Sequence, residues 1–358
     1  MYRITKNVPY YVFGRGSLAQ LGDLLKPRRE AVDGPVVYFV DHFFRDHELI
    51  GRLPMEKGDQ LHFVDSSSEP EVTRIDAFKE AVSAADSRTP CCVVGIGGGN
   101  ALDTAKAVAN LLTNPGKAED YQGWELVKNP AVYKIGIPTL SGTGSECSRT
   151  CVLTNIPKNL KLGMNSDYTV YDQLLLDPDL LATVPRDQYF YTGIDTFMHC
   201  VESLQGSYRN AIIDAFSIRA VQLCEEIFLS DDMMSEENRE KMMIASYIGG
   251  MAAGNVGVIH PFSAGLGVVL HVAHGLGNCL ALNVLGDIYP KEYKQFRTMI
   301  ERQGVNLPTG ICKDLTEEQY EGLYRGCIVH EKPLTNALGP DFKQILTREN
   351  LIERYKSI

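Results

Sequence analysis

The sequence lacks the features of a membrane protein and of a general nucleic-acid binder. No uninterrupted apolar stretch reaches the roughly 18 residues that a membrane span needs. Lysine and arginine number 35 against 45 aspartate and glutamate residues, a net charge of −10, so no basic excess exists to meet phosphates. Residues 1–6 also lack the apolar core of a secretory signal. We therefore expect a cytoplasmic protein that binds neither nucleic acid nor membranes.

Cysteine is present without a pattern that indicates disulfides or a zinc site. The nine cysteines are an odd number, in a chain too long to need disulfide staples. Cys147 and Cys151 have the spacing of half a zinc site, but no second pair completes it. Reduced thiols in a cytoplasm are the expected state.

The order of the secondary-structure patterns predicts two domains. The chain has 358 residues, which exceeds the usual size of one core. Over residues 1–182, strand and helix patterns alternate, which predicts a Rossmann-like α/β domain with a mostly parallel sheet. Residues 183–358 show mostly helical patterns, which predict an all-α, metal- and substrate-binding domain. A cofactor is expected in the cleft between the two domains.

Individual segments support this division. The strands of the first domain are predicted over residues 36–40, 61–64, 91–96 and 133–138. Helices are predicted over residues 71–85, 100–112, 211–228 and 236–253.

A glycine-rich turn after a predicted strand indicates a phosphate-binding site. Gly97, Gly98 and Gly99 let the backbone approach an anion and adopt positive φ. The following helix would direct its unpaired N–H groups and its positive dipole end to the same place. A tight turn without a ligand is the alternative. The loop at residues 141–145 (Ser-Gly-Thr-Gly-Ser) follows another predicted strand and favours the phosphate site, because its small residues would close over the same phosphates and ribose.

An acidic residue at the end of a predicted strand favours NAD over NADP. Asp41 follows residues 36–40 directly. In dinucleotide-binding folds, an acid at this place accepts hydrogen bonds from the adenosine ribose and repels a 2′-phosphate. A capping role for Asp41 at the following helix is the alternative.

Four residues in the second half have the types and spacings of a divalent-metal site. Asp195 and His199 are four positions apart, which on a helix places carboxylate and imidazole on one face. A surface hydrogen bond between the two is the alternative. His260 and His274 are 14 residues apart, about 21 Å on one straight helix, so they share an ion only if the chain turns between them.

The residues between the last two histidines include candidate helix breakers. We predict that Pro261, Gly265 and Gly267 supply the required turn, and that a new helix or turn starts at His274. One carboxylate and three imidazoles without a thiolate suit Zn²⁺ or Fe²⁺. The predicted role of the ion is Lewis-acid catalysis on an alcohol oxygen at an open coordination position.

These motifs resemble those of the iron-containing, or group III, metal-dependent alcohol dehydrogenases over nearly the whole chain. The resemblance is carried by Gly97-Gly98-Gly99-Asn100 with Asp103 and Lys106, Ile137-Pro138-Thr139 with residues 142–146, Thr192-Gly193-Ile194-Asp195 with His199 and Glu202, and His260 with His274-Gly275. It implies an N-terminal dinucleotide domain, an all-helical C-terminal domain, NAD(P) in the cleft and a homodimer.

The resemblance also implies roles for single residues. The four metal ligands would be Asp195, His199, His260 and His274. The residues that bind or line the cofactor would be Gly97, Gly98, Gly99, Asn100, Asp103, Thr139, Thr143, Ser145 and Lys161, with Asp41 at the ribose.

The chain departs from the family pattern at a few positions. Ala264 stands where a second histidine is common, four residues after the third ligand, and Asn100 stands where serine is usual. His271 is an additional imidazole, which could relay protons from the alcohol or could be packed on a helix face. The proton path and the substrate pocket therefore depend on features particular to this chain.

Within the family, the chain resembles enzymes that oxidise the C8 hydroxyl of 3-deoxy-manno-octulosonate to an 8-aldehyde in lipopolysaccharide sugar biosynthesis. This implies a sugar-acid substrate and a pathway aminotransferase that uses the aldehyde. Arg149 is a candidate partner for the substrate carboxylate. The alternatives are a dehydrogenase of another small polyol or alcohol, a sugar-phosphate cyclase of the dehydroquinate synthase type, and a redox sensor without catalysis.

Overall fold

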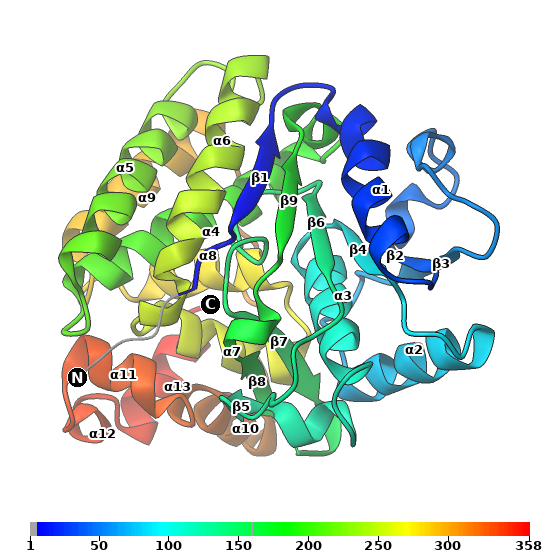
Figure 1. The fold of residues 1–358 in the computed structure, drawn as a ribbon. Coiled ribbons are helices and arrows are strands. Elements are labelled where there is room, and N and C mark those ends of the chain that lie inside the picture. The colour runs from blue at the N-terminus through cyan, green and yellow to red at the C-terminus, as the bar shows by residue number, and fades with distance from the viewer. Residues whose placement is uncertain (1–5, 159) are drawn as a thin grey trace. The chain divides into compact units, whose positions relative to one another are not determined.

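The computed structural model describes residues 6–158 and 160–358 (Figure 1). The chain divides into two compact units, which we call the α/β unit and the helical unit. The α/β unit extends to Leu140 and continues over Ser145–Thr183. The helical unit comprises Ser141–Gly144 and Val184–Ile358. The loop at 141–144 therefore belongs to the helical unit, although it precedes Thr183 in the chain.

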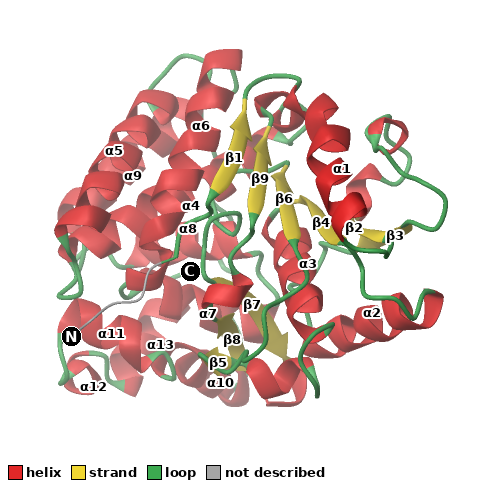
Figure 2. Ribbon diagram, viewed as in Figure 1, coloured by secondary structure: helices red, strands yellow, loops and turns green. Residues whose placement is uncertain are grey.

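A six-stranded sheet forms the centre of the α/β unit (Figure 2). Its strands, in spatial order, are β1 (Tyr10–Phe13), β9 (Gln173–Leu176), β6 (Lys134–Pro138), β4 (Cys92–Gly97), β2 (Val36–Asp41) and β3 (Gln60–Val64). Every neighbouring pair runs parallel. The long helices of this unit are α1 (Leu21–Ala31), α2 (Val72–Ala85) and α3 (Gly99–Leu111). The predicted Rossmann-like parallel sheet is confirmed.

The two faces of this sheet are both buried, which explains the continuous apolar runs in its central strands. In β2, Val37 and Phe39 pack into a core that includes residues of α2 and α3. Val36, Tyr38 and Val40 of the same strand pack on the other face, in a core that includes residues of α1. The alternation of side chains along a strand thus fills two cores from one strand.

A second, three-stranded sheet lies in the α/β unit and was not predicted. Its strands, in spatial order, are β5 (Gly123–Trp124), β8 (Leu160–Asn165) and β7 (Thr150–Asn155). β7 and β8 pair antiparallel, and only alternate side chains of β7 are buried. β1 and β9 were also not predicted. β1, β5 and β9 have four residues or fewer, and β7 and β8 mix polar with apolar residues, so none of them has the apolar run that identified β2 and β4.

The helical unit contains no strand among its described residues. Its helices are α4 (Arg186–Gln205), α5 (Ala211–Phe228), α6 (Glu236–Gly249), α7 (Ile259–Leu270), α8 (His274–Val284), α9 (Pro290–Gln303), α10 (Glu317–Ile328), α11 (Glu331–Leu338), α12 (Phe342–Ile345) and α13 (Arg348–Lys356). α4 packs against α5, α6 and α8, and α7 packs against α8 and α10. The predicted all-α character of this region is confirmed.

The helix predicted over residues 236–253 ends earlier than expected. α6 stops at Gly249, and a 3₁₀ segment, Gly250–Asn255, follows it. In the described part of the chain, no single helix is long and apolar enough to cross a membrane. Glu236–Asn255 together with Ile259–Leu270 passes the same length and composition test only as a pair bent by 91°.

The loop at residues 141–144 is held by α4 and α6. Gly142 N donates to Ser246 Oγ at 2.8 Å, and Thr196 Oγ1 donates to Gly142 O at 2.9 Å. Gly142 has a φ of +149°, and a Cβ built there would lie 1.6 Å from the carbonyl oxygen of Thr192. Only glycine permits this close approach of the loop to α4, the helix that carries Asp195.

Candidate metal and nucleotide sites

Helix α4 presents the first two residues of the predicted metal site. Asp195 and His199 lie one helical turn apart on its buried side, with 0% and 4% of their surfaces exposed. Because side chains at i and i+4 share a helix face, their ligand atoms converge, and His199 Nε2 lies 3.8 Å from Asp195 Oδ1. The surface hydrogen bond considered as an alternative does not describe this buried pair.

The chain turns between the other two histidines, but at a different place than predicted. His260 is the second residue of α7, and His274 is the first residue of α8. The turn falls at residues 271–273, where His271 ends α7 in a left-handed conformation with φ +55°. Pro261, Gly265 and Gly267, the predicted breakers, all lie inside α7.

The packing of α7 explains why these residues do not break it. Pro261 lies in the first helical turn, where its missing N–H costs no helical hydrogen bond. A Cβ built at Gly265 would lie 2.7 Å from the carbonyl oxygen of Leu323 in α10. This glycine therefore permits close helix packing and does not end the helix.

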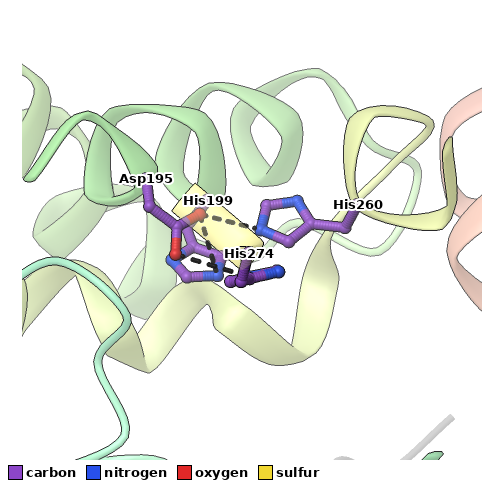
Figure 3. Close-up of side chains that lie close together, drawn as sticks. All are labelled: Asp195, His199, His260 and His274. Atoms are coloured by element: carbon purple, nitrogen blue, oxygen red, sulfur yellow. Dashed lines mark hydrogen bonds and ion pairs between the residues drawn. The ribbon is translucent and has the colours of Figure 1, made fainter. Parts of the chain in front are cut away.

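The four predicted ligands converge on one point (Figure 3). One ligand atom from each of Asp195, His199, His260 and His274 can be chosen so that all lie within 4.8 Å of one another. Asp195 Oδ1 lies 3.1 Å from His260 Nε2, and Asp195 Oδ2 lies 3.5 Å from His274 Nε2. The rings of His199 and His260 stack with centroids 4.4 Å apart.

This arrangement fits a divalent metal ion by distance and by charge. Ligand atoms at the corners of a tetrahedron with bonds of about 2.0 Å are about 3.3 Å apart, close to the 3.1–3.8 Å separations around Asp195. Asp195 and the nearby Glu202 are almost completely buried, and neither has a lysine or arginine partner among the described residues. His274 keeps 29% of its side chain exposed, so the cluster is not sealed from small molecules.

The electrostatics of the cluster also favour a bound cation. Burial acts to raise the pKa of Asp195, but the surrounding histidines, including a hydrogen bond from His260, outweigh it, and the pKa lies below its usual value. Burial lowers the pKa of His199 to about 3, which keeps its imidazole neutral, as a ligand must be. Burial opposes charge on His260, but Glu202 and Asp195 raise its pKa to about 9. The cluster therefore favours positive charge, which a metal ion would supply.

Two residues outside the predicted ligand set hold the ligands in place. Glu202 accepts a hydrogen bond from His260 Nδ1 at 2.5 Å, and Asn278 Nδ2 donates to Asp195 Oδ1 at 2.7 Å. Neither was predicted as a site residue, although Glu202 was among the residues that carried the family resemblance. The available signal was spacing, since Glu202 and Asn278 follow His199 and His274 by one helical turn and therefore share their faces.

The added imidazole at position 271 is not packed on a helix face. His271 is exposed and occupies the C-terminal cap of α7, so the packed alternative is wrong. Its proton-relay role stays a prediction. Ala264, which replaces the second histidine of the family pattern, is buried inside α7.

The glycine turn of the α/β unit lies where the predicted phosphate site requires it. β4 ends at Gly97, Gly98 is the N-cap, and α3 begins at Gly99. Gly97 has a φ of +151°, and a Cβ there would lie 2.6 Å from the Cβ of Ala101 and 2.9 Å from that of Asp41. β3 and β4 lie on opposite sides of β2, so the order in which strands are added to the sheet changes direction between β3 and β4. Nucleotides bind outside the carboxyl ends of strands at such a switch point.

Asp41 has the position expected of a ribose-binding acid and also caps a short helix. Its Oδ1 accepts a hydrogen bond from Phe43 N at 3.0 Å, and its Oδ2 accepts one from Ser66 Oγ at 2.8 Å. The capping alternative is therefore seen in the structure. The contact with ribose stays a prediction, and each oxygen retains a lone pair for it.

Replacing Asp41 with glycine is expected to raise kcat/KM for NADP at least about tenfold, equivalent to about 1.4 kcal/mol, because the charge that repels a 2′-phosphate is removed. The measurement is kcat/KM for NAD and for NADP with one alcohol. Asp41→Asn tests the charge with the cap retained, since the asparagine oxygen can still accept from Phe43 N, and it should also admit NADP. An unchanged cofactor preference in both variants would exclude Asp41 from the nucleotide site.

Two other predicted cofactor residues, Asp103 and Ser145, already have partners within the α/β unit, as does Lys106. Both oxygens of Asp103 accept hydrogen bonds, one from Ser145 Oγ and one from Val152 N at 2.8 Å. Lys106 donates to the carbonyl oxygens of Ser145 and Thr150. These contacts hold residues 145–152 against α3, so Asp103 and Ser145 have a structural role.

The remaining predicted site residues are distributed along the chain. Asn100 Nδ2 donates to Ser68 O at 2.9 Å, and Thr139 N donates to Gly97 O at 3.0 Å. Lys161 pairs with Glu69 at 3.0 Å. Thr143 lies in the loop that belongs to the helical unit. Their contacts with a cofactor stay predictions.

Comparisons with known proteins identify the family of this chain. The family model described as iron-containing alcohol dehydrogenase matches residues 9–178, and the model of the C-terminal part of the same family matches residues 189–322. The chain is 34% identical to sulfoacetaldehyde reductase of Bilophila wadsworthia over 60% of this chain and 56% of that protein. It is 30% identical to NAD-dependent methanol dehydrogenase of Bacillus methanolicus over 75% of this chain and 71% of that protein.

Solved structures show the same fold at lower sequence identity. The structure of sulfoacetaldehyde reductase from Bifidobacterium kashiwanohense in complex with NAD⁺ aligns with a TM-score of 0.79 at 24% identity, covering 99% of this chain and 98% of that one. An alcohol dehydrogenase from Oenococcus oeni aligns with a TM-score of 0.83 at 21% identity, covering 99% of both chains. The chain belongs to the iron-containing alcohol dehydrogenase family, oxidoreductases that act on CH–OH groups with NAD and a divalent metal ion.

Proposed function

We propose that this protein catalyses the NAD- and metal-dependent interconversion of a primary alcohol and its aldehyde. The observation that supports this most directly is the convergence of Asp195, His199, His260 and His274 on one point in the helical unit. A divalent ion held by these residues would supply Lewis-acid chemistry that lowers the pKa of an alcohol hydroxyl. Family membership favours this reaction over the cyclase and sensor alternatives.

The residues of the chain have distinct tasks in this reaction. Asp195 would supply the negative charge of the ligand set, and the neutral imidazole of His199 would supply a lone pair. In the α/β unit, the turn at residues 97–99 and the N-terminal end of α3 would bind the pyrophosphate of NAD. Asp41 would bind the adenosine ribose. We keep His271 as the proposed proton relay, because an exposed imidazole can exchange protons with water.

For the substrate we propose the C8 hydroxyl of 3-deoxy-manno-octulosonate, oxidised to an 8-aldehyde. The support is the resemblance of the sequence motifs. The names of the relatives point to smaller compounds, among them sulfoacetaldehyde, methanol and 1,3-propanediol. Sulfoacetaldehyde carries an acidic group, as the sugar acid does, whereas the two simple alcohols do not. Recognition of an anionic group on the substrate therefore distinguishes the sugar acid and sulfoacetaldehyde from methanol and 1,3-propanediol.

A substrate panel tests this proposal. Each candidate, with simple diols and butanol added, is incubated with NAD or NADH while nicotinamide absorbance is followed and metal content is measured. We expect turnover that disappears with a chelator and returns with Zn²⁺ or Fe²⁺, and the highest kcat/KM for the sugar acid. Turnover independent of metal would contradict the mechanism, and a preference for methanol or propanediol would contradict the substrate.

Arg149 is the proposed partner of the substrate carboxylate. Its guanidinium already pairs with Glu125 and Asp167 in the α/β unit, each at 2.6 Å, so a substrate would have to displace one of them. If the proposal holds, Arg149→Ala raises the KM for the sugar acid about tenfold or more, which equals the 1.4 kcal/mol expected of a charge-assisted hydrogen bond. The KM for a neutral alcohol serves as the control. An unchanged KM for the sugar acid removes Arg149 from the substrate site.

The cellular setting is part of the same proposal. We propose a cytoplasmic homodimer that passes its aldehyde product to an aminotransferase in lipopolysaccharide sugar biosynthesis. Analytical ultracentrifugation tests the dimer. Transamination of the enzymatic product by a sugar aminotransferase tests the proposed pathway step.

A further inference from the structure

The side chain of Glu202 contacts the candidate metal ligand His260 on the ring nitrogen that does not face Asp195. Its Oε2 is 2.5 Å from His260 Nδ1, whereas His260 Nε2 lies 3.1 Å from Asp195 Oδ1. One imidazole therefore bridges two buried carboxylates. Because an ionised carboxylate only accepts hydrogen bonds, the proton on Nδ1 faces Glu202. When the ring is neutral, as a metal ligand must be, its lone pair lies on Nε2, the nitrogen that faces Asp195. Figure 3 shows the ring of His260 turned toward Asp195 in this way.

Glu202 is itself held rigidly. Its Oε1 accepts hydrogen bonds from Ile259 N at 2.6 Å and from Tyr289 Oη at 3.1 Å. Tyr289 Oη in turn accepts a hydrogen bond from Val258 N at 3.0 Å. Glu202 thus contacts both the ring of His260 and the backbone next to it, and so holds the whole start of α7 against α4.

Among the described residues, the only positive partner available to the Glu202 carboxylate is the imidazole of His260. Only 1% of the residue is exposed, and among the described residues no lysine or arginine pairs with it. Asp195 and Glu202 together carry two negative charges in the interior, where an unbalanced charge is costly. A divalent cation at the converging ligands would balance them.

We propose that Glu202 is a positioning residue that fixes His260 in the tautomer whose Nε2 binds the metal, and that it supplies the second negative charge of a site built for a divalent ion. This rests on the metal site of the proposed function. Outer-shell partners of metal-binding histidines orient the ring and raise its basicity, and their loss weakens metal binding about 10–100-fold. Asn278 acts on a different ligand, Asp195, and is not needed for this effect.

The variant Glu202→Gln tests the proposal. Glutamine keeps the size of the side chain and removes the charge. Its single oxygen can accept from His260 Nδ1 or from Ile259 N, but not from both. The dissociation constant for Zn²⁺ is measured by competition with a chromophoric chelator, and thermal unfolding of the metal-free protein is followed in parallel. We expect an increase of about 10–100-fold in the dissociation constant. The unfolding temperature of the metal-free protein reports separately the stability lost with one buried hydrogen bond.

Glu353→Gln is the matched control. Glu353 is exposed on α13 and pairs with Lys356 at 3.0 Å, so the substitution makes the same change in net charge at the surface. It should leave the Zn²⁺ dissociation constant within about twofold of the wild-type value. A dissociation constant for Glu202→Gln that matches this control would overturn the proposal.

If Glu202→Gln does not fold, a measurement on the wild-type protein tests which nitrogen of His260 binds the metal. In the zinc-loaded protein, ¹⁵N spectra of the histidine rings should show His260 bound through Nε2 with a protonated Nδ1. Binding through Nδ1 would contradict the positioning role. If the wild-type protein binds no Zn²⁺, the proposed function fails as well; if it binds Zn²⁺ and the variant binds equally well, only the inference about Glu202 fails.

Discussion

Replacing Asp195 with asparagine is expected to abolish metal-dependent turnover. Asp195 lies at the centre of the cluster, with one histidine Nε2 at 3.1 Å and another at 3.5 Å. Asparagine keeps the shape but loses the only negative charge of the ligand set, and its amide N–H groups would face lone pairs that the metal needs. Zn²⁺ affinity should therefore fall by more than the roughly 100-fold loss that is typical when a residue hydrogen-bonded to a metal ligand is removed.

Metal content by mass spectrometry and kcat/KM at a fixed Zn²⁺ concentration check this prediction. Asp187→Asn is the control, because Asp187 is exposed in the first turn of the same helix and the substitution removes the same charge. The control should retain both metal and activity. An Asp195→Asn enzyme that binds Zn²⁺ as tightly as the control would place the metal site elsewhere.

Replacing Gly142 with alanine should have the largest effect on stability. The new Cβ would lie 1.6 Å from the carbonyl oxygen of Thr192, a backbone atom that cannot move without moving α4. The φ of +149° adds strain for any residue with a side chain. We expect the free energy of unfolding to fall by about 3–5 kcal/mol and Zn²⁺ binding to weaken, since α4 carries Asp195 and His199.

A substitution at Gly14 separates the effect of the steric clash from the effect of the backbone strain. Gly14 has nearly the same φ, +146°, but a Cβ built there meets nothing within 4 Å. Gly14→Ala should therefore cost only about 1–2 kcal/mol of backbone strain and leave Zn²⁺ binding unchanged. Urea unfolding followed by far-ultraviolet circular dichroism compares the two variants. Equal destabilisation by both substitutions would show that the close approach of the loop to α4 is not needed.

The parts of the fold that sequence patterns predict well are those with a strong local signal. β2 and β4 are covered on both faces, so their apolar runs are unbroken and were recognised within one or two residues. β1 is a short strand at the sheet edge with exposed Tyr10 and Tyr11, and it gives no such signal. Burial on both faces, more than strand character itself, is what the sequence patterns detect.

The candidate metal site shows the same limit. Residue types and the four-residue spacing were enough to select Asp195 and His199, because helix geometry makes neighbours of i and i+4. The position of the turn before His274 was missed, because a glycine that permits close packing, such as Gly265, has the same sequence signature as a helix breaker.

The nucleotide site shows what spacing alone cannot decide. Counting from Gly99 places Asp103 one turn into α3, but does not tell which segment packs beside it. In the structure, residues 145–152 lie there, and Ser145 and Val152 donate to its carboxylate. A contact made by a loop distant in sequence has no local pattern. Glu202 differs, because its spacing from His199 in α4 was a local signal, and only its contact with His260 came from a distant segment.

Crystals of the protein soaked with Zn²⁺, with anomalous diffraction recorded on both sides of the zinc absorption edge, test the central claim most directly. We predict one anomalous peak per chain, about 2.0–2.2 Å from an oxygen of Asp195 and from the Nε2 atoms of His199, His260 and His274. A peak at other residues, or no peak where these four side chains meet, would contradict the account.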